Sequence, residues 1–142
     1  MHPNLYADGK VCLSILGTWG TKEWSPLLTF EKVLYTIQGL LDNNPVLHEP
    51  GQRRNNTYEE SYRATARYWG LKAGVVDVLK RTDLNPEIMD IMKNYFQKNI
   101  DKYIQSAEKL RPYDNRTVQS FHSTVHINVD KLITEIKHLF KI

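Results

Sequence analysis

The chain has 142 residues, of which 41% are hydrophobic and 25% are charged, and its formal net charge is +3. This length fits about one domain, and the modest charge argues against a dedicated nucleic-acid binder, which would carry a strong basic stripe. The single cysteine, Cys12, cannot form an internal disulfide, and no apolar run approaches the roughly 18 residues of a membrane span. We therefore expect no nucleic-acid or membrane partner, and a cytoplasmic or nuclear location.

The first 24 residues are rich in Gly and Trp and predict irregular chain with one short strand, Lys10–Leu16. The dipeptide Asp8-Gly9 before that strand is a strong signal for a tight turn, because Gly tolerates positive φ. Counting outward from the turn places Asn4 close to Cys12. The sequence therefore predicts that a carboxamide and a thiol meet at one end of a tight loop.

Four later segments show apolar residues that recur at spacings of three and four, which is the pattern of one helical face. Thr29 is placed to N-cap the first segment, and Thr57 with Glu60 fits a capping box at the start of the second. Pro86 suits the first turn of the third. Loops are predicted at residues 43–56 and 112–123. The four predicted helices span residues 29–42, 57–81, 86–110 and 129–139.

Two interpretations of Cys12 are open from its neighbours alone. Free cysteines are among the residues most often buried, so composition favours a structural core residue. In an extended segment, however, Val11 and Leu13 point to one face and Cys12 points to the other. Such a strand can be buried and still present its thiol. The Asn4 carboxamide can then donate to an oxyanion that grows on a carbonyl attached to the sulfur.

Two other kinds of site are weaker hypotheses. A Cys-His hydrolase would need one of four histidines, His48, His122, His126 or His138, as its base, and nothing in the sequence fixes any of them near Cys12. A metal site would rest on His122 and His126, which lack a convincing third ligand. The single cysteine also excludes the common structural zinc patterns, so we expect no metal.

Three short motifs agree with one known family. They are His-Pro-Asn at residues 2–4, the Cys-Leu-Ser-Ile-Leu run at 12–16, and the Trp-Ser-Pro step at 24–26. With the eight-residue step from Asn4 to Cys12, they closely resemble the ubiquitin-conjugating enzymes. The insertion at residues 17–19 and the loop at 44–51 look most like the larger, Use1-type branch of that family. The resemblance fades after about Leu110.

The resemblance implies a role for each motif residue. Cys12 would accept the C-terminal carboxyl of ubiquitin, or of a ubiquitin-like protein, as a thioester, which the amine of an acceptor lysine then attacks. Asn4 would stabilise the oxyanion, the active-site loop, or both, while His2 and Pro3 hold the shape of that loop. Glu49 or His48 would help to orient the incoming lysine. No cofactor is implied, because the thioester stores the energy that the activating enzyme drew from ATP.

The same resemblance implies the protein partners. Besides the modifier, they are an activating enzyme, a ubiquitin ligase and a protein substrate. The step formed by Ser25, Pro26 and Leu27 would be part of the surface that ligases grip. Attack on a thioester needs an amine placed near a carbonyl. Holding the acceptor lysine beside the thioester would therefore account for much of the rate of transfer.

The expected fold class is α+β, as the helix-rich, C-terminal part of a ubiquitin-conjugating-enzyme-like fold with little remaining sheet. Residues 1–110 would form the catalytic domain, and residues 111–142 an extension with a final amphipathic helix. In the family, a helix and about three strands precede His-Pro-Asn, and here that motif starts at His2, so we expect those elements to be absent. The alternative function is a catalytically inactive remnant that acts as an interaction module.

Overall fold

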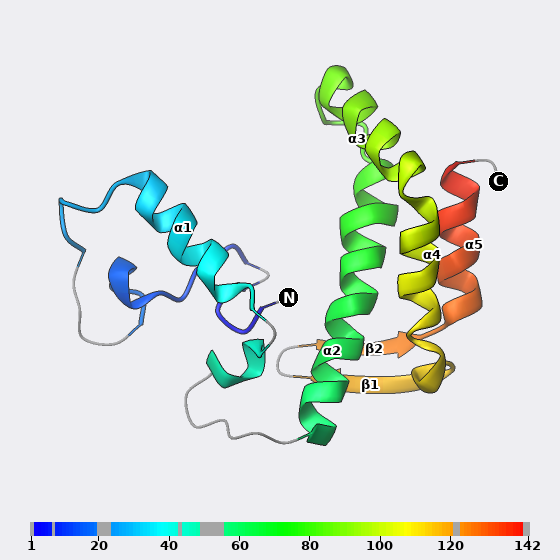
Figure 1. The fold of residues 1–142 in the computed structure, drawn as a ribbon, viewed down its shortest axis with the longest axis horizontal. Coiled ribbons are helices and arrows are strands. Elements are labelled where there is room, and N and C mark those ends of the chain that lie inside the picture. The colour runs from blue at the N-terminus through cyan, green and yellow to red at the C-terminus, as the bar shows by residue number, and fades with distance from the viewer. Residues whose placement is uncertain are drawn as a thin grey trace. The chain divides into compact units, whose positions relative to one another are not determined.

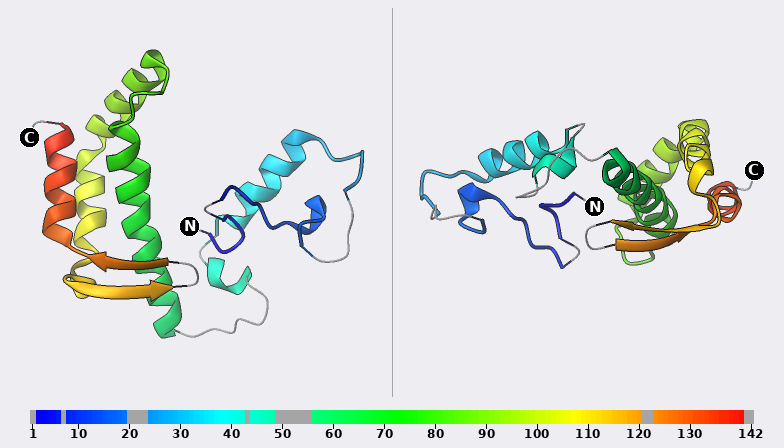
Figure 2. Two further views of the ribbon diagram at one scale, coloured as in Figure 1. Left: turned by 180° about the vertical axis from the view of Figure 1, so that it is seen from behind. Right: turned by 90° about the horizontal axis from the view of Figure 1, so that it is seen from below.

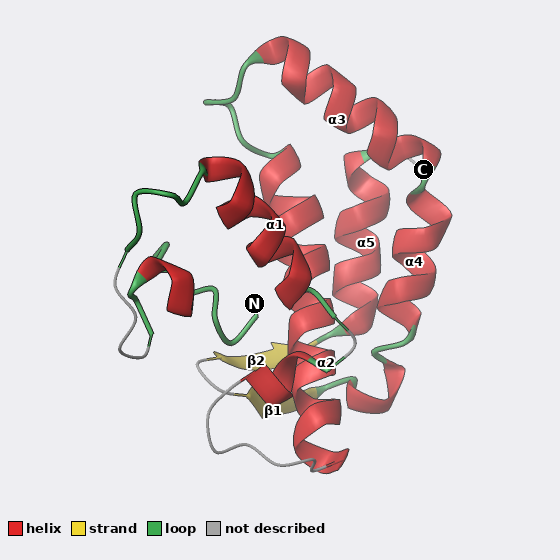
Figure 3. Ribbon diagram, turned by 60° about the vertical axis from the view of Figure 1, so that its left-hand side comes forward, coloured by secondary structure: helices red, strands yellow, loops and turns green. Residues whose placement is uncertain are grey.

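A computed structural model describes residues 2–6, 8–19, 24–42, 44–48, 56–120 and 123–140. The chain divides into two compact units, Met1–Glu59 and Glu60–Ile142. In the described residues, helices dominate and one two-stranded sheet accompanies them, as the red and yellow ribbons of Figure 3 show. This is a helix-rich α+β structure, which confirms the predicted fold class.

The first unit begins with a tight reversal of the backbone. Gly9 adopts a φ of +90°, a conformation that Gly reaches without strain, and Leu5 pairs with Val11 in an isolated antiparallel bridge. The predicted strand over 10–16 was wrong, because the ladder ends after this bridge and Ser14–Leu16 form a 3-10 turn. The physical cause lies at Leu13, whose backbone N–H donates to the Thr18 hydroxyl at 2.9 Å instead of to another strand.

Helix α1 spans Phe30–Leu40 and confirms the first predicted helix. The Thr29 side chain caps its N-terminus by accepting a hydrogen bond from the backbone N–H of Lys32 at 3.3 Å. A further 3-10 turn, Pro45–His48, lies in the segment predicted as a loop. The 3-10 turn supplies His48, whose ring lies near the ring of His2.

Helix α2 spans Asn56–Leu71 and continues as a π-helical turn over Lys72–Asp77. It covers most of the predicted helix over 57–81. The predicted capping box was wrong, because the helix already includes Asn56 and Thr57 lies within its first turn. The wider π turn brings Lys72 and Asp77, five residues apart, to one side of the helix, where their charged groups lie 2.9 Å apart.

The predicted single helix over 86–110 is two helices, α3 (Pro86–Lys98) and α4 (Ile100–Glu108). They meet at Asn99, which has a φ of −115° and a ψ of 14°. Its side-chain amide donates to the backbone carbonyl of Tyr95 at 2.8 Å. Asn offers the backbone local hydrogen bonds that compete with the helix, and this explains the break.

An antiparallel hairpin occupies most of the segment that was predicted as a loop over 112–123, and that prediction was wrong. Strand β1 spans Arg116–Ser120 and strand β2 spans Ser123–Ile127, with Val118 opposite Val125. Buried and exposed residues alternate along both strands, which gives the hairpin one apolar face. The hairpin is tied to α2 by a 2.5 Å hydrogen bond between the Thr65 and Ser120 hydroxyls.

Helix α5 spans Val129–Leu139, as predicted, and Asn128 caps its N-terminus. Figures 1 and 2 show α2, α4 and α5 side by side, with the hairpin across one end. Their facing side chains form the main core of the second unit. Thirteen buried residues make up this core: Ala64, Leu71, Val76, Ile100, Ala107, Leu110, Val118, Val125, Ile127, Val129, Leu132, Ile133 and Ile136.

The same core joins residues on both sides of the predicted boundary at residue 110. The hairpin and α5 pack against α2 and α4 and do not form a unit by themselves. The predicted division into 1–110 and 111–142 rests on family resemblance rather than on packing, and it stays a prediction.

Candidate functional site

The candidate site is built on the reversal at Asp8-Gly9. The backbone N–H of Cys12 donates to the carbonyl of Asn4 at 2.8 Å, and the backbone N–H of Tyr6 donates to the carbonyl of Lys10 at 3.0 Å. These two bonds enclose the bridge between Leu5 and Val11 and place Asn4 beside Cys12. The proximity predicted from the turn is confirmed by these bonds.

The Asn4 side chain is buried and adds a third bond across the reversal. Its amide nitrogen donates to the backbone carbonyl of Cys12 at 3.0 Å. A carboxamide nitrogen carries two N–H groups, so this bond uses one of them. In this geometry Asn4 fixes the conformation of the loop at Cys12, and its second N–H has no acceptor among the described residues.

Thr18 holds the chain on both sides of Cys12. Its hydroxyl accepts from the backbone N–H of Leu13 at 2.9 Å and donates to the backbone carbonyl of Val11 at 2.6 Å. Thr18 was not predicted from the sequence, because nothing in its spacing indicates that its hydroxyl bonds to the backbone of residues 11–13. Gly17, with a φ of +65°, makes the return possible.

The Cys12 sulfur is partly exposed, while the side chain of Leu13 is buried. The sulfur lies 3.6 Å from the backbone carbonyl oxygen of Thr18, and in that contact the S–H group donates. Val11, on the other side of Cys12, is also only partly buried. A half-exposed thiol can meet another protein, which a sealed core cysteine cannot do.

His2 and Pro3 are buried beneath the loop. The His2 Nδ1 atom accepts a hydrogen bond from the backbone N–H of Asn4 at 3.2 Å, so that nitrogen carries no proton. Burial lowers the pKa of His2 below its ordinary value, and the neighbouring His48 lowers it further. A neutral imidazole in this position supports the loop at Asn4.

A second polar group lies next to His2. The rings of His2 and His48 are 5.4 Å apart between centroids, and the Nε2 of His48 lies 3.1 Å from a carboxylate oxygen of Asp42. The backbone N–H of Asn44 holds the pKa of Asp42 below its usual range, and His48 contributes to the same effect. Among the described residues, no histidine forms a hydrogen bond with Cys12, so the geometry gives the hydrolase hypothesis no support.

The predicted ligase-binding step has a defined local shape. The backbone N–H of Leu27 donates to the Ser25 hydroxyl at 3.3 Å, which forms a tight turn. Pro26 is exposed, and the side chain of Leu27 is 81% exposed. Glu49, the last predicted site residue, lies outside the described residues.

The part of the chain that the structure describes has neither a cluster of metal ligands nor a membrane-spanning helix. No cluster of three or more potential metal ligands occurs there. No helix there has the length and apolar character needed to cross a bilayer.

Comparison with known proteins finds that the first part of the chain, which contains the reversal, matches one family model. Residues 1–69 match the family model "Ubiquitin-conjugating enzyme". The chain is similar to "Ubiquitin-conjugating enzyme E2 Z" of Danio rerio, with 38% identity over 105 residues, which cover 72% of this chain and 32% of that protein. The Homo sapiens protein of the same name is 34% identical over 121 residues, or 83% of this chain and 34% of its own length. The chain thus spans about a third of the length of these relatives.

A third similar protein matches over a shorter stretch. "Dual E2 ubiquitin-conjugating enzyme/E3 ubiquitin-protein ligase BIRC6" of Homo sapiens is 40% identical over 74 residues, which cover 49% of this chain and 2% of that protein.

Proposed function

We propose that this chain is a ubiquitin-conjugating enzyme, whose family model its residues 1–69 match, and that it carries ubiquitin, or a ubiquitin-like protein, as a thioester on Cys12. An acceptor lysine then receives the modifier. The observation that carries this proposal is the half-exposed Cys12 thiol, held beside Asn4 by reciprocal bonds across a tight reversal. A structural cysteine would need none of this support.

The proposed transfer balances without a cofactor. The lysine nitrogen attacks the thioester carbonyl and forms a C–N bond, the C–S bond breaks, and the lysine loses a proton as Cys12 regains its thiol. Negative charge grows on the carbonyl oxygen during this attack, and a fixed N–H donor stabilises it. Asn4 is suited to both of its proposed roles, because one N–H holds the loop and the other is left for the oxyanion.

The other proposed roles follow the same family. His2 and Pro3 support the loop from below, Ser25, Pro26 and Leu27 contribute to the ligase surface, and Glu49 helps to orient the acceptor lysine. An activating enzyme, a ligase and a protein substrate are the proposed partners, in the cytoplasm or nucleus. The similarity to E2 Z proteins supports assignment to the larger, Use1-type branch, which we also propose.

A charging assay tests the proposal. The chain is incubated with activating enzyme, ATP and ubiquitin and analysed on a non-reducing gel. We expect a band heavier by one ubiquitin that disappears with thiol reductant, because a thioester exchanges with free thiols. In Cys12→Ser the corresponding band should resist reductant, because an oxygen ester replaces the thioester, and Cys12→Ala should give no such band.

The alternative, a catalytically inactive interaction module, predicts a different result. Folded protein, verified by circular dichroism, would then give no thiol-sensitive band at any concentration of activating enzyme. That outcome would overturn the proposed activity while leaving the family assignment in place.

A further inference from the structure

Lys10 is the cation nearest to Cys12 in the chain, and the reversal places both on one face. Side chains alternate along extended backbone, so residues two apart share a side. The bond from the Tyr6 N–H to the Lys10 carbonyl and the bond from the Cys12 N–H to the Asn4 carbonyl fix that extended geometry at both residues. Leu5 and Val11, the bridge pair, therefore lie on the opposite face.

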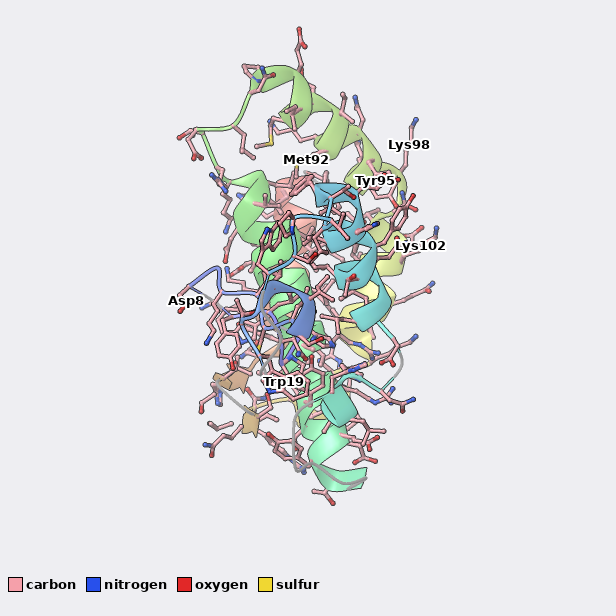
Figure 4. All side chains as sticks on the ribbon, turned by 90° about the vertical axis from the view of Figure 1, so that its left-hand side faces the viewer. Asp8, Trp19, Met92, Tyr95, Lys98 and Lys102 are labelled. Atoms are coloured by element: carbon pink, nitrogen blue, oxygen red, sulfur yellow. The ribbon has the colours of Figure 1, made fainter. Side chains whose placement is uncertain are left out.

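The position of the Lys10 side chain supports this assignment. Its ammonium nitrogen lies 5.4 Å from the centre of the Tyr6 ring, and Tyr6 stands across the reversal from Lys10. Two residues along an extended chain span about 6.6 Å, which is within the reach of a lysine side chain. Lys10 is exposed and forms no ion pair among the described residues, so its amine is free to leave the ring. The Asp8 carboxylate, labelled in Figure 4, accepts a hydrogen bond from the backbone N–H of Lys10 at 3.0 Å.

We propose that Lys10 is an intramolecular acceptor for the modifier carried on Cys12. This inference rests on the proposed thioester. The deprotonated Lys10 amine attacks the thioester carbonyl, an isopeptide C–N bond forms, the C–S bond breaks, and the proton released by the nitrogen restores the Cys12 thiol. No further reactant enters, and an amine held this close has a large effective concentration.

The product has a direct consequence for the chain. A modifier joined to Lys10 stands two residues from Cys12 and cannot be removed by thiols. It would obstruct the next activating enzyme and the next acceptor. A charged chain that meets no substrate would in this way convert itself into a permanently modified and inactive form, which links the lifetime of the enzyme to the supply of acceptors.

A single-turnover experiment tests the inference. The chain is charged with ubiquitin, ATP is removed, and the decay of the thioester and the growth of a reductant-resistant adduct are followed without added acceptor. The adduct formed per charged chain should fall at least about tenfold in Lys10→Arg, because the attacking amine is lost and the positive charge is kept. The matched control is Lys32→Arg, which changes an exposed lysine of the same unit and should leave that ratio as in the wild type.

Two further measurements separate intramolecular from intermolecular transfer. The rate constant for adduct formation should stay constant when the charged chain is diluted, and peptide mass spectrometry should find the modifier remnant on Lys10. An adduct on another lysine, a rate that rises with concentration, or decay by hydrolysis alone would overturn the Lys10 inference and leave the proposed thioester intact. Failure to form any thioester would overturn both.

Discussion

Asn4 is bonded to Cys12 through two groups, its side-chain amide and its backbone carbonyl. Its buried amide donates to the Cys12 carbonyl at 3.0 Å, while its own backbone carbonyl accepts from Cys12 at 2.8 Å. The loop is thus fixed before any modifier arrives, and a donor held in advance needs no reorganisation during the reaction. The effect of Asn4 should therefore be larger on transfer than on charging.

Asn4→Ala should lower the rate of transfer to free lysine by about a hundredfold, the usual cost of losing one oxyanion donor. The rate of charging should fall much less, because that step also gains from contacts with the activating enzyme. Pre-charged chain mixed with lysine measures the first rate, and initial charging measures the second. Asn94→Ala, at an exposed position of α3, is the control. Equal losses in both steps would assign Asn4 to the loop alone.

Thr18 should position Cys12 through its hydroxyl. Thr18→Val keeps the side-chain shape but removes the bonds to Leu13 and Val11, and we expect charging to slow by about tenfold, since small displacements of a reacting group are costly. Thr18→Ser retains the hydroxyl and should restore most of the rate. Initial rates of thioester formation compare the three proteins. If Val and Ser variants behave alike, the hydroxyl has no positioning role.

His2 makes the stability of the chain depend on pH in a defined direction. Burial lowers its pKa below the ordinary value of 6.5, so the unfolded chain binds a proton more readily than the folded one. The stability from neutral His2 is complete above pH 6.5 and is lost as the pH falls toward the lowered pKa. The neighbouring His48 reinforces this direction, and Asp42 opposes it.

The melting temperature should accordingly fall as the pH is lowered from about 7.5 to about 5. In His2→Gln the decrease should be smaller, because the titrating group is gone while a polar side chain remains. Thermal unfolding followed by circular dichroism measures both curves. Parallel pH profiles for the two proteins would show that His2 does not contribute.

Residue-scale prediction from sequence succeeded where one local signal determined the geometry. The dipeptide Asp8-Gly9 predicted the reversal. The number of residues on each side of it then predicted that Asn4 lies beside Cys12. Thr18 was missed because its contact depends on a 3-10 turn and on the positive φ of Gly17. The pairing of His48 with Asp42 was missed for a related reason, since it needs the turn at Pro45–His48 to bring the two side chains together.

At the scale of elements, the π turn is held by charge. Lys72 donates to Glu135 of α5 at 2.7 Å and lies 2.9 Å from Asp77, and both Lys72 and Glu135 are mostly buried. The hydrogen bond to Glu135 is the largest cause that raises the pKa of Lys72. This contact joins the π turn to α5, so it contributes to the packing of the second unit.

Lys72→Met should lower the free energy of unfolding by about 1 kcal/mol, because it removes a partly buried ion pair and leaves Glu135 without its donor. Lys80→Met, at an exposed position shortly after the π turn, is the control and should change little. Urea unfolding followed by circular dichroism gives both values. The account of the π turn would fail if the two variants lost equal stability.

Some of the predicted helices and loops were correct and others were wrong, and each outcome has an identifiable cause. Helices α1 and α5 have strong apolar periodicity and asparagine or threonine caps, and both were found at nearly the predicted bounds. The hairpin was missed because β1 and β2 are short and carry several polar residues, with no Asn-Gly or Asp-Gly signal between them. The break at Asn99 was missed because apolar periodicity continues across it.

At the scale of the whole molecule, the candidate site and the main core lie in different units. The reversal, Cys12 and Asn4 belong to Met1–Glu59, whereas the main core described above belongs to Glu60–Ile142. The helix of the first unit, α1, has no buried residue, and Phe30 is 77% exposed.

The family match also divides the molecule. It covers residues 1–69 and therefore the candidate site, but not α3, α4, the hairpin or α5. Motif spacing alone indicated the family whose model matches these residues, because its signature is local. It was not sufficient to predict the core of the second unit, which depends on contacts between α2, the hairpin and α5 that are distant in sequence.

The central claim is that the Cys12 sulfur carries the modifier. Intact-mass spectrometry of the chain after incubation with activating enzyme, ATP and ubiquitin tests it most directly. The account predicts a species heavier by one ubiquitin less one water, lost on brief treatment with hydroxylamine and absent from Cys12→Ala. An unmodified mass for the folded wild type, or an adduct that persists in Cys12→Ala, would contradict it.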